Sequence, residues 1–206
     1  MYSRSRFDAF TDGVFSVAMT LLVVDVRLPD ALVPGDSAAF VEALRGLEPK
    51  LLAYGMSFAV LGASWLAKLA GEKRSETLGR SEAMLTLLYL FLVTLTPFST
   101  MALSAGALRA SADVLPAVWI YCGTLGAIGL VTTLIPLARR AYTPEEAPLS
   151  IFAPLCLLAA SLAAAGLATL GWSHWPYAFL ITILGGLADR RARKLTPVDE
   201  GRPSAS

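Results

Sequence analysis

The residues able to carry acid–base or ligand chemistry are few in this chain, and their spacing argues against a catalytic centre. Asp8 and Asp12 lie four positions apart, so a helix would place them one turn apart as a paired-carboxylate site. Helix-capping and salt-bridge roles are commoner for such carboxylates. His174 is the single histidine, and Cys122 and Cys156 fall within apolar runs, where a thiol behaves as a small hydrophobe. We therefore expect that the protein has no metal site or cofactor and is not an enzyme.

The composition instead indicates a membrane protein. Of the 206 residues 55% are hydrophobic and 16% are charged, and the mean hydropathy is +0.60. Several apolar runs are about 20 residues long, the length with which a helix crosses roughly 30 Å of hydrocarbon. The formal net charge of +1 gives no general electrostatic reason to bind nucleic acid, so the lipid bilayer is the expected partner.

Six membrane helices are expected in an all-α membrane protein. The apolar runs place them at about 8–28, 49–70, 82–104, 114–138, 148–170 and 173–188. The last run crosses only if Trp172 and Trp175 lie at the level of the lipid headgroups. We expect residues 1–194 to form one transmembrane domain and residues 195–206, rich in Pro, Gly and Ser, to be a disordered cytoplasmic tail.

The distribution of basic residues predicts the orientation. An even number of helices puts both termini on one side, and most Lys and Arg residues fall on that side: Arg4, Arg6, Lys73, Arg74, Arg80, Arg139, Arg140, Arg190, Arg191, Arg193 and Lys194. The opposite loops hold Arg27, Arg45, Lys50 and Arg109. By the positive-inside rule both termini are expected in the cytoplasm, with the chain a multi-pass protein of the inner (plasma) membrane.

The segment 29–48 is expected on the outer side. It spaces Phe40, Leu44 and Leu47 at helical intervals, which is typical of a short amphipathic helix on the membrane surface, with Asp36 or Ser37 as its cap. A plain connector is the alternative.

The first membrane helix is unusual because it is polar near its start. A carboxylate such as Asp12 is costly inside a span unless it is paired or hydrated. We expect it to accept hydrogen bonds from a neighbouring helix or subunit, with Lys68, Arg74 and Arg80 as candidate donors. A purely structural role in helix packing is the alternative to a role in transport.

Further along the same helix, one stripe is nearly apolar. Spacings of three and four place on it Gly13, Val17, Thr20, Leu21, Val24 and Leu28. Ser16 and Thr20 flank the stripe with hydroxyls, which cost little because each can bond to the carbonyl four residues before. Taken alone, the stripe is more typical of a lipid-facing or packing surface than of a conduit.

The start of this helix reads Arg6-Phe7-Asp8-Ala9-Phe10-Thr11-Asp12. It resembles the Arg-x-x-x-Phe-Ser-Asp motif that marks the first helix of the transmembrane protein 175 family of potassium channels. The resemblance continues through Val26 and Pro29 and includes Trp65 and Pro97-Phe98-Ser99-Thr100, so it covers roughly the first 105 residues. Thr11 stands where serine is usual and keeps the hydroxyl, whereas Lys68 stands where related sequences tend to carry histidine.

The resemblance implies a homotetramer of six-helix subunits with four copies of the first helix around a central pore. Such a pore would conduct potassium in preference to sodium without a Thr-Val-Gly-Tyr-Gly filter, a string that this sequence lacks. By position relative to the motif aspartate, Val17 would form the narrowest ring, and Leu21 and Val24 the next layers. Ser16 and Thr20 match the hydroxyl positions tied to selectivity.

The motif residues would then have a different role from the pore residues. Arg6, Phe10, Thr11 and Asp12 would lock the cytoplasmic mouth instead of binding ions, with Trp65 and Lys68 as network partners. A ring of valines offers an ion nothing in place of its water, so the gate is expected to be hydrophobic and the preference for potassium modest.

Two other functions stay open. A proton-permeable or weakly selective cation channel would share this architecture. A secondary transporter is the other alternative, for which interrupted helices are typical, and Gly126, Gly129, Gly185 and Gly186 are a weak form of that signal.

Overall fold

The computed structural model describes residues 2–28, 37–69, 77–108, 114–140, 152–171 and 175–179. Its elements are the strands β1 (Tyr2–Ser3) and β2 (Thr77–Leu78), the helices α1 (Arg4–Leu22), α2 (Ser37–Gly46), α3 (Glu48–Leu69), α4 (Arg80–Leu108), α5 (Leu115–Arg140) and α6 (Phe152–Thr169), and the 3-10 turns η1 (Val23–Asp25) and η2 (Trp175–Phe179). Within these ranges the fold is helical apart from the two short strands.

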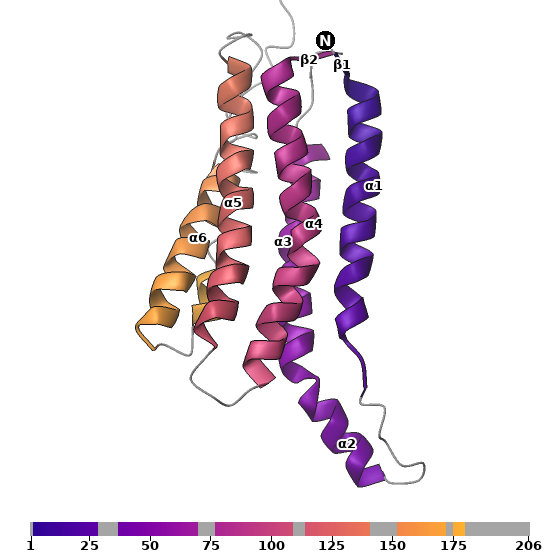
Figure 1. Cartoon of the computed structure of the whole chain (residues 1–206), viewed down its shortest axis with the longest axis vertical. Coiled ribbons are helices and arrows are strands. Elements are labelled where there is room, and N and C mark those ends of the chain that lie inside the picture. Colours follow the sequence, from indigo (N-terminus) through magenta and orange to yellow (C-terminus); the bar gives the residue numbers. More distant parts are fainter. Residues whose placement is uncertain are drawn as a thin grey trace, which may run out of the picture.

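The long helices lie side by side in a bundle (Figure 1). The central helix α4 packs against α1, α3 and α5, and α5 packs in turn against α6. We call the two ends of the bundle the Arg4 end, where α1 and α4 begin and α5 finishes, and the Asp25 end, where α1 finishes and α3 begins. Helix α1 stands at the edge of the bundle, and α2 projects from the Asp25 end (Figure 1).

Four helical stretches of the described chain are long and apolar enough to cross a membrane. They are Arg4–Asp25, Ser37–Leu69, Arg80–Gly106 and Leu115–Ala138, and the shorter Ala153–Thr169 is also apolar. The helices expected near 8–28, 49–70, 82–104, 114–138 and 148–170 are therefore present, with bounds shifted by a few residues. The short helix expected within 29–48 is present as α2, which begins at Ser37.

The structure describes only an early part of the sixth helix expected at 173–188. Within the expected sixth helix, Trp175–Phe179 forms a 3-10 turn, while residues 180–188 lie outside the described part of the chain. The expected tail at 195–206, and with it the proposed domain limit at 194, also lies outside.

The core is apolar and closely packed where small residues meet. Tyr121, Leu125 and Ile128 of α5 are fully buried. A Cβ built on Gly129 would come within 2.8 Å of the backbone nitrogen of Leu158, so glycine is needed for α5 and α6 to approach each other. Packing thus explains Gly129 without an interrupted transporter helix.

Candidate functional site in helix α1

Helix α1 buries one side against the bundle. Thr11, Phe15, Ala18 and Leu22 are spaced by three and four residues and are each at most 2% exposed. The ring of Phe15 lies 5.8 Å from that of Tyr89 on α4, centroid to centroid. This side fixes how α1 is rotated about its axis.

The opposite side of α1 carries the apolar stripe expected from the sequence, and the described part of the chain does not cover it. Val17 is 58% exposed, Leu21 49% and Val24 44%. A Cβ built on Gly13 would meet nothing within 4 Å. An apolar stripe of this length, left uncovered by the described residues of its subunit, is a surface for lipid or for another copy of the chain.

Two hydroxyls border the stripe. Ser16 and Thr20 are both exposed. The Thr20 hydroxyl lies within hydrogen-bond distance of the carbonyls of Ser16 (3.0 Å) and Val17 (2.8 Å), so its proton is used inside the helix. Its oxygen lone pairs remain available to water or a cation.

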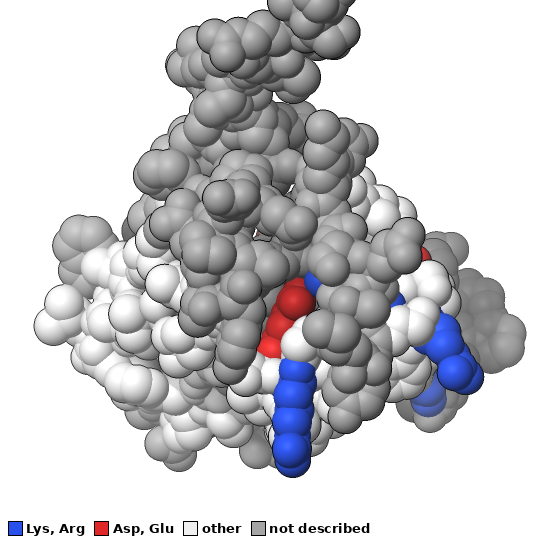
Figure 2. Space-filling model, turned by 90° about the horizontal axis from the view of Figure 1, so that it is seen from above, with Lys and Arg blue, Asp and Glu red and all other residues white. Residues whose placement is uncertain are grey.

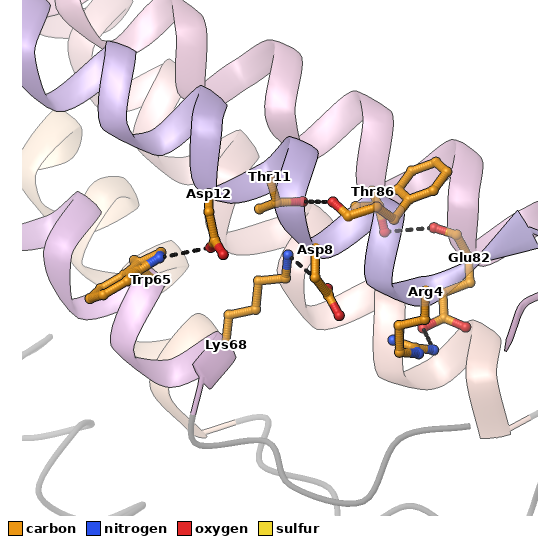
Figure 3. A network of polar contacts seen from close by, with 9 residues as sticks. Arg4, Asp8, Thr11, Asp12, Trp65, Lys68, Glu82 and Thr86 are labelled. Carbon is orange, nitrogen blue, oxygen red and sulfur yellow. Dashed lines mark hydrogen bonds and ion pairs between the residues drawn. The ribbon is translucent and has the colours of Figure 1, made fainter. Parts of the chain in front are cut away.

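The two carboxylates near the start of α1, Asp8 and Asp12, have partners on α3 (Figure 3). The indole Nε1 of Trp65 donates a 3.1 Å hydrogen bond to Oδ1 of Asp12. The ammonium of Lys68 lies 3.3 Å from Oδ1 of Asp8, one turn earlier. Thr11 is fully buried, and its hydroxyl donates to the carbonyl of Phe7 at 2.8 Å.

The hydrogen-bond donor that the structure gives Asp12 is not one of the three cations considered for it. The hydrogen bond to this carboxylate comes from Trp65, while Lys68, one of the three cations considered as its donor, forms an ion pair with Asp8. Arg80 is exposed, and Arg74 lies outside the described residues. Sequence spacing could not decide between these partners because Trp65 lies 53 positions from Asp12.

The two remaining residues of the predicted lock behave differently. Arg6 and Phe10 are exposed, with Phe10 at 55%, so within the described part of one subunit they are not enclosed in the network. Figure 2, which looks onto the Arg4 end, shows Lys and Arg side chains reaching outwards at its rim with acidic side chains between them.

A buried ion pair fastens the start of α1 to α4. Arg4 NH2 lies 2.9 Å from Oε1 of Glu82, and both side chains are about nine-tenths buried. Beside it, β1 pairs antiparallel with β2, Tyr2 opposite Leu78 and Ser3 opposite Thr77. Arg4 and Glu82 lie 78 positions apart, so no sequence spacing indicates that they pair.

A second polar cluster at the Asp25 end was also missed. The Ser104 hydroxyl of α4 donates a 2.6 Å hydrogen bond to Oδ2 of Asp25. Lys50 of α3 donates to the backbone carbonyl of Asp25 at 3.2 Å, and its Nζ lies 4.0 Å from Oδ1. Helix α1 is thus held by polar groups at both ends, with the apolar stripe between them.

Among the described residues, no group of three or more His, Cys, Asp or Glu side chains could hold a metal ion. Cys122 is buried and Cys156 half-buried, as expected for thiols in apolar helices. His174 lies outside the described residues.

Comparison with known proteins shows that the chain is similar to ion channels. Residues 6–97 match the model of the family described as endosomal/lysosomal potassium channel TMEM175. A potassium channel of Streptomyces collinus is 35% identical over 50% of this chain and 49% of its own length. A potassium channel of Chamaesiphon minutus is 32% identical over 61% of both chains. The mouse endosomal/lysosomal proton channel TMEM175 is 33% identical over 60% of this chain and 26% of its own.

The similarity to a solved structure extends further than these sequence matches. The crystal structure of a lysosomal potassium-selective channel TMEM175 homolog from Chamaesiphon minutus is similar with a TM-score of 0.66 and 26% identity. That likeness covers 90% of this chain and 97% of the other. In sequence, by contrast, the chain spans about half to three-fifths of the length of the two prokaryotic relatives.

Proposed function

We propose that the chain is a member of the TMEM175 family of ion channels, and that it is a potassium channel whose pore is lined by α1 of four subunits. Each subunit would contribute six membrane helices, the sixth beginning near Trp175. The subunit itself, the bilayer and potassium ions are the partners that this function requires.

The observation that carries the proposal is the bare stripe on α1. Val17, Leu21 and Val24 are 44–58% exposed, while Phe15, Ala18 and Leu22 on the other side are at most 2% exposed. Four copies of the stripe around an axis would cover one another and leave a narrow apolar passage. The polar clusters at the two ends of α1 hold the stripe in this orientation.

In such a passage the narrowest ring would act by excluding water. Four valine side chains give a cation no oxygen ligands, so a ring of Val17 that is too narrow to hold water stays closed, and one that widens and fills with water conducts. The hydroxyls of Ser16 and Thr20 border the stripe and would supply oxygen ligands beside the ring. Because this device is weaker than a rigid carbonyl cage, the preference for potassium over sodium should be modest.

The same proposal fixes the direction in the membrane. The Arg4 end, which carries the exposed Arg6 and Arg80, would face the cytoplasm by the positive-inside rule. Both termini would then be cytoplasmic, and α2 would lie at the outer surface. The exposed Phe40, Val41 and Leu44 of α2 would rest in the lipid interface there.

Ion flux from liposomes tests the function. The full chain is reconstituted, and potassium, sodium and proton gradients are applied in turn, with protein-free liposomes as the control. Potassium efflux that is faster than sodium efflux and does not require a proton gradient supports the channel. Saturable flux coupled to protons would replace it with a transporter. Proton flux is measured because the mouse relative is named a proton channel.

A further inference from the structure

We propose that Asp25 is a positioning residue for ion conduction: held by Ser104 and Lys50, it fixes the rotation of the end of α1 and so the size of the pore at Leu21 and Val24. The inference rests on the proposed function, and it assigns a role to a cluster outside the motif at the Arg4 end.

The hydrogen bond between Ser104 and Asp25 is short and shielded. Its length of 2.6 Å falls in the range of a charge-assisted bond from a hydroxyl to a carboxylate. Ser104 is 1% exposed, so water has little access to the donor. Ser104 also lies 2.9 Å from the carbonyl of Met101, but a hydroxyl has one proton, and the charged oxygen is the stronger acceptor.

Lys50 holds the same residue from a second helix. Its ammonium donates to the carbonyl of Asp25 at 3.2 Å and lies 4.0 Å from Oδ1, and both side chains are only about a quarter exposed. The carbonyl of Asp25 lies at the end of the helical segment, where it also accepts a hydrogen bond from the backbone N–H of Arg27 at 3.0 Å. Asp25 is therefore attached to α3 by Lys50 and to α4 by Ser104.

This attachment controls the stripe because Asp25 adjoins it in sequence. Val24 is 44% exposed and Leu21, about one turn before Asp25, is 49% exposed, whereas Asp25 turns towards α3 and α4. A rotation by one residue position would turn each side chain by about 100° and take Val24 off the axis. At the Arg4 end Trp65 and Lys68 hold the helix in the same way.

A carboxylate near a pore could act differently, by attracting cations through its charge. The two roles predict different results. A charge effect depends on the carboxylate alone and weakens as salt screens it. A positioning effect depends equally on Ser104, which is neutral, and does not weaken with salt.

The experiment uses the full chain in planar bilayers at low and at high potassium concentration. Asp25→Asn and Ser104→Ala are each expected to change single-channel conductance or open probability, and the potassium-to-sodium permeability ratio, by roughly two- to tenfold, the range for losing one hydrogen bond. Each variant should show the same change at low and at high potassium concentration. The double variant should differ from the wild type by no more than either single variant does. Ser104→Thr keeps the hydroxyl and should behave as the wild type.

Glu42→Gln is the matched control, because Glu42 is an acidic residue at the same end of the bundle, on α2, with a side chain 76% exposed. Its replacement should change nothing. If Ser104→Ala does not assemble, Lys50→Gln carries the test and should alter conduction in the same direction. Ser104→Ala or Lys50→Gln that conducts as the wild type, or an Asp25→Asn effect that disappears at high potassium, overturns the inference. A wild-type protein that passes no potassium overturns the proposed function instead.

Discussion

Trp65 on α3 donates the hydrogen bond that satisfies Asp12 on α1, with 3.1 Å between the indole Nε1 and the carboxylate Oδ1. The residue that makes the first helix unusual therefore finds a partner within its own subunit. Because the bond joins two helices, it fixes the position of the start of α1 along α3 (Figure 3).

Replacing Trp65 with Phe should destabilise the protein by about 1 kcal/mol, because an aromatic ring is retained and one hydrogen bond to an exposed carboxylate is lost. Thermal unfolding in detergent measures the effect. Trp119→Phe is the control, because Trp119 is 54% exposed on α5. Equal melting temperatures for the two variants would show that the bond contributes nothing.

The helical period predicts the stripe, but spacing alone does not predict which residues pair at its two ends. Val17, Leu21 and Val24 follow from the helical period, and the structure leaves all three exposed. Trp65 and Asp12 meet only once α1 and α3 are packed, which no spacing reveals. Ser104 reads as an ordinary membrane hydroxyl that bonds within its own helix, and nothing local indicates its bond to Asp25.

The helices themselves could be predicted because each is a long apolar run between charges. The expected sixth helix was the shortest run, and its described part is a 3-10 turn at Trp175–Phe179. Gly129 shows the opposite difficulty. In sequence it resembles a helix interruption, whereas in the structure it is the place where α5 and α6 come into contact.

The buried pair of Arg4 and Glu82 should be important for stability. Its side chains are only 10% and 11% exposed, so Arg4→Met removes the cation that lies 2.9 Å from a buried carboxylate and should cost about 3 kcal/mol. A second change, Glu82→Leu, should restore part of the loss. Chemical denaturation in detergent measures both.

An exposed ion pair serves as the comparison for this prediction. Arg45 and Glu42 lie 3.5 Å apart with side chains 75% and 76% exposed, so Glu42→Gln should change stability by less than about 0.5 kcal/mol. If Arg4→Met is as mild as Glu42→Gln, the pair at the Arg4 end does not hold α1 to α4.

Gly129 should tolerate no side chain. A Cβ there would lie 2.8 Å from the nitrogen of Leu158 and 2.9 Å from the carbonyl oxygen of Pro154, so Gly129→Ala must push α5 and α6 apart, at a cost of about 1–3 kcal/mol. Gly123→Ala, on the same helix with nothing within 4 Å, should be neutral or slightly stabilising. Melting temperatures that fall equally would contradict the close packing.

Changes of size and polarity at Val17 should move ion flux in opposite directions. Val17→Asn wets the proposed ring and should raise potassium efflux from liposomes while lowering the potassium-to-sodium ratio, whereas Val17→Leu narrows the ring and should reduce efflux. Leu162→Val on α6, at a side chain 66% exposed, is the control for an apolar change elsewhere. Unchanged flux in both Val17 variants would remove this residue from the pore.

Silver block of a cysteine at position 17 tests most directly whether α1 lines the pathway. Cys122 and Cys156 are first replaced with Ala, and Val17→Cys or Leu162→Cys is added to that background. Ag⁺ binds thiolates and carries the same charge as potassium. Potassium efflux should stop on addition of Ag⁺ for Val17→Cys and continue for Leu162→Cys and the background. Continued efflux through Val17→Cys in the presence of Ag⁺ would contradict a pore lined by α1.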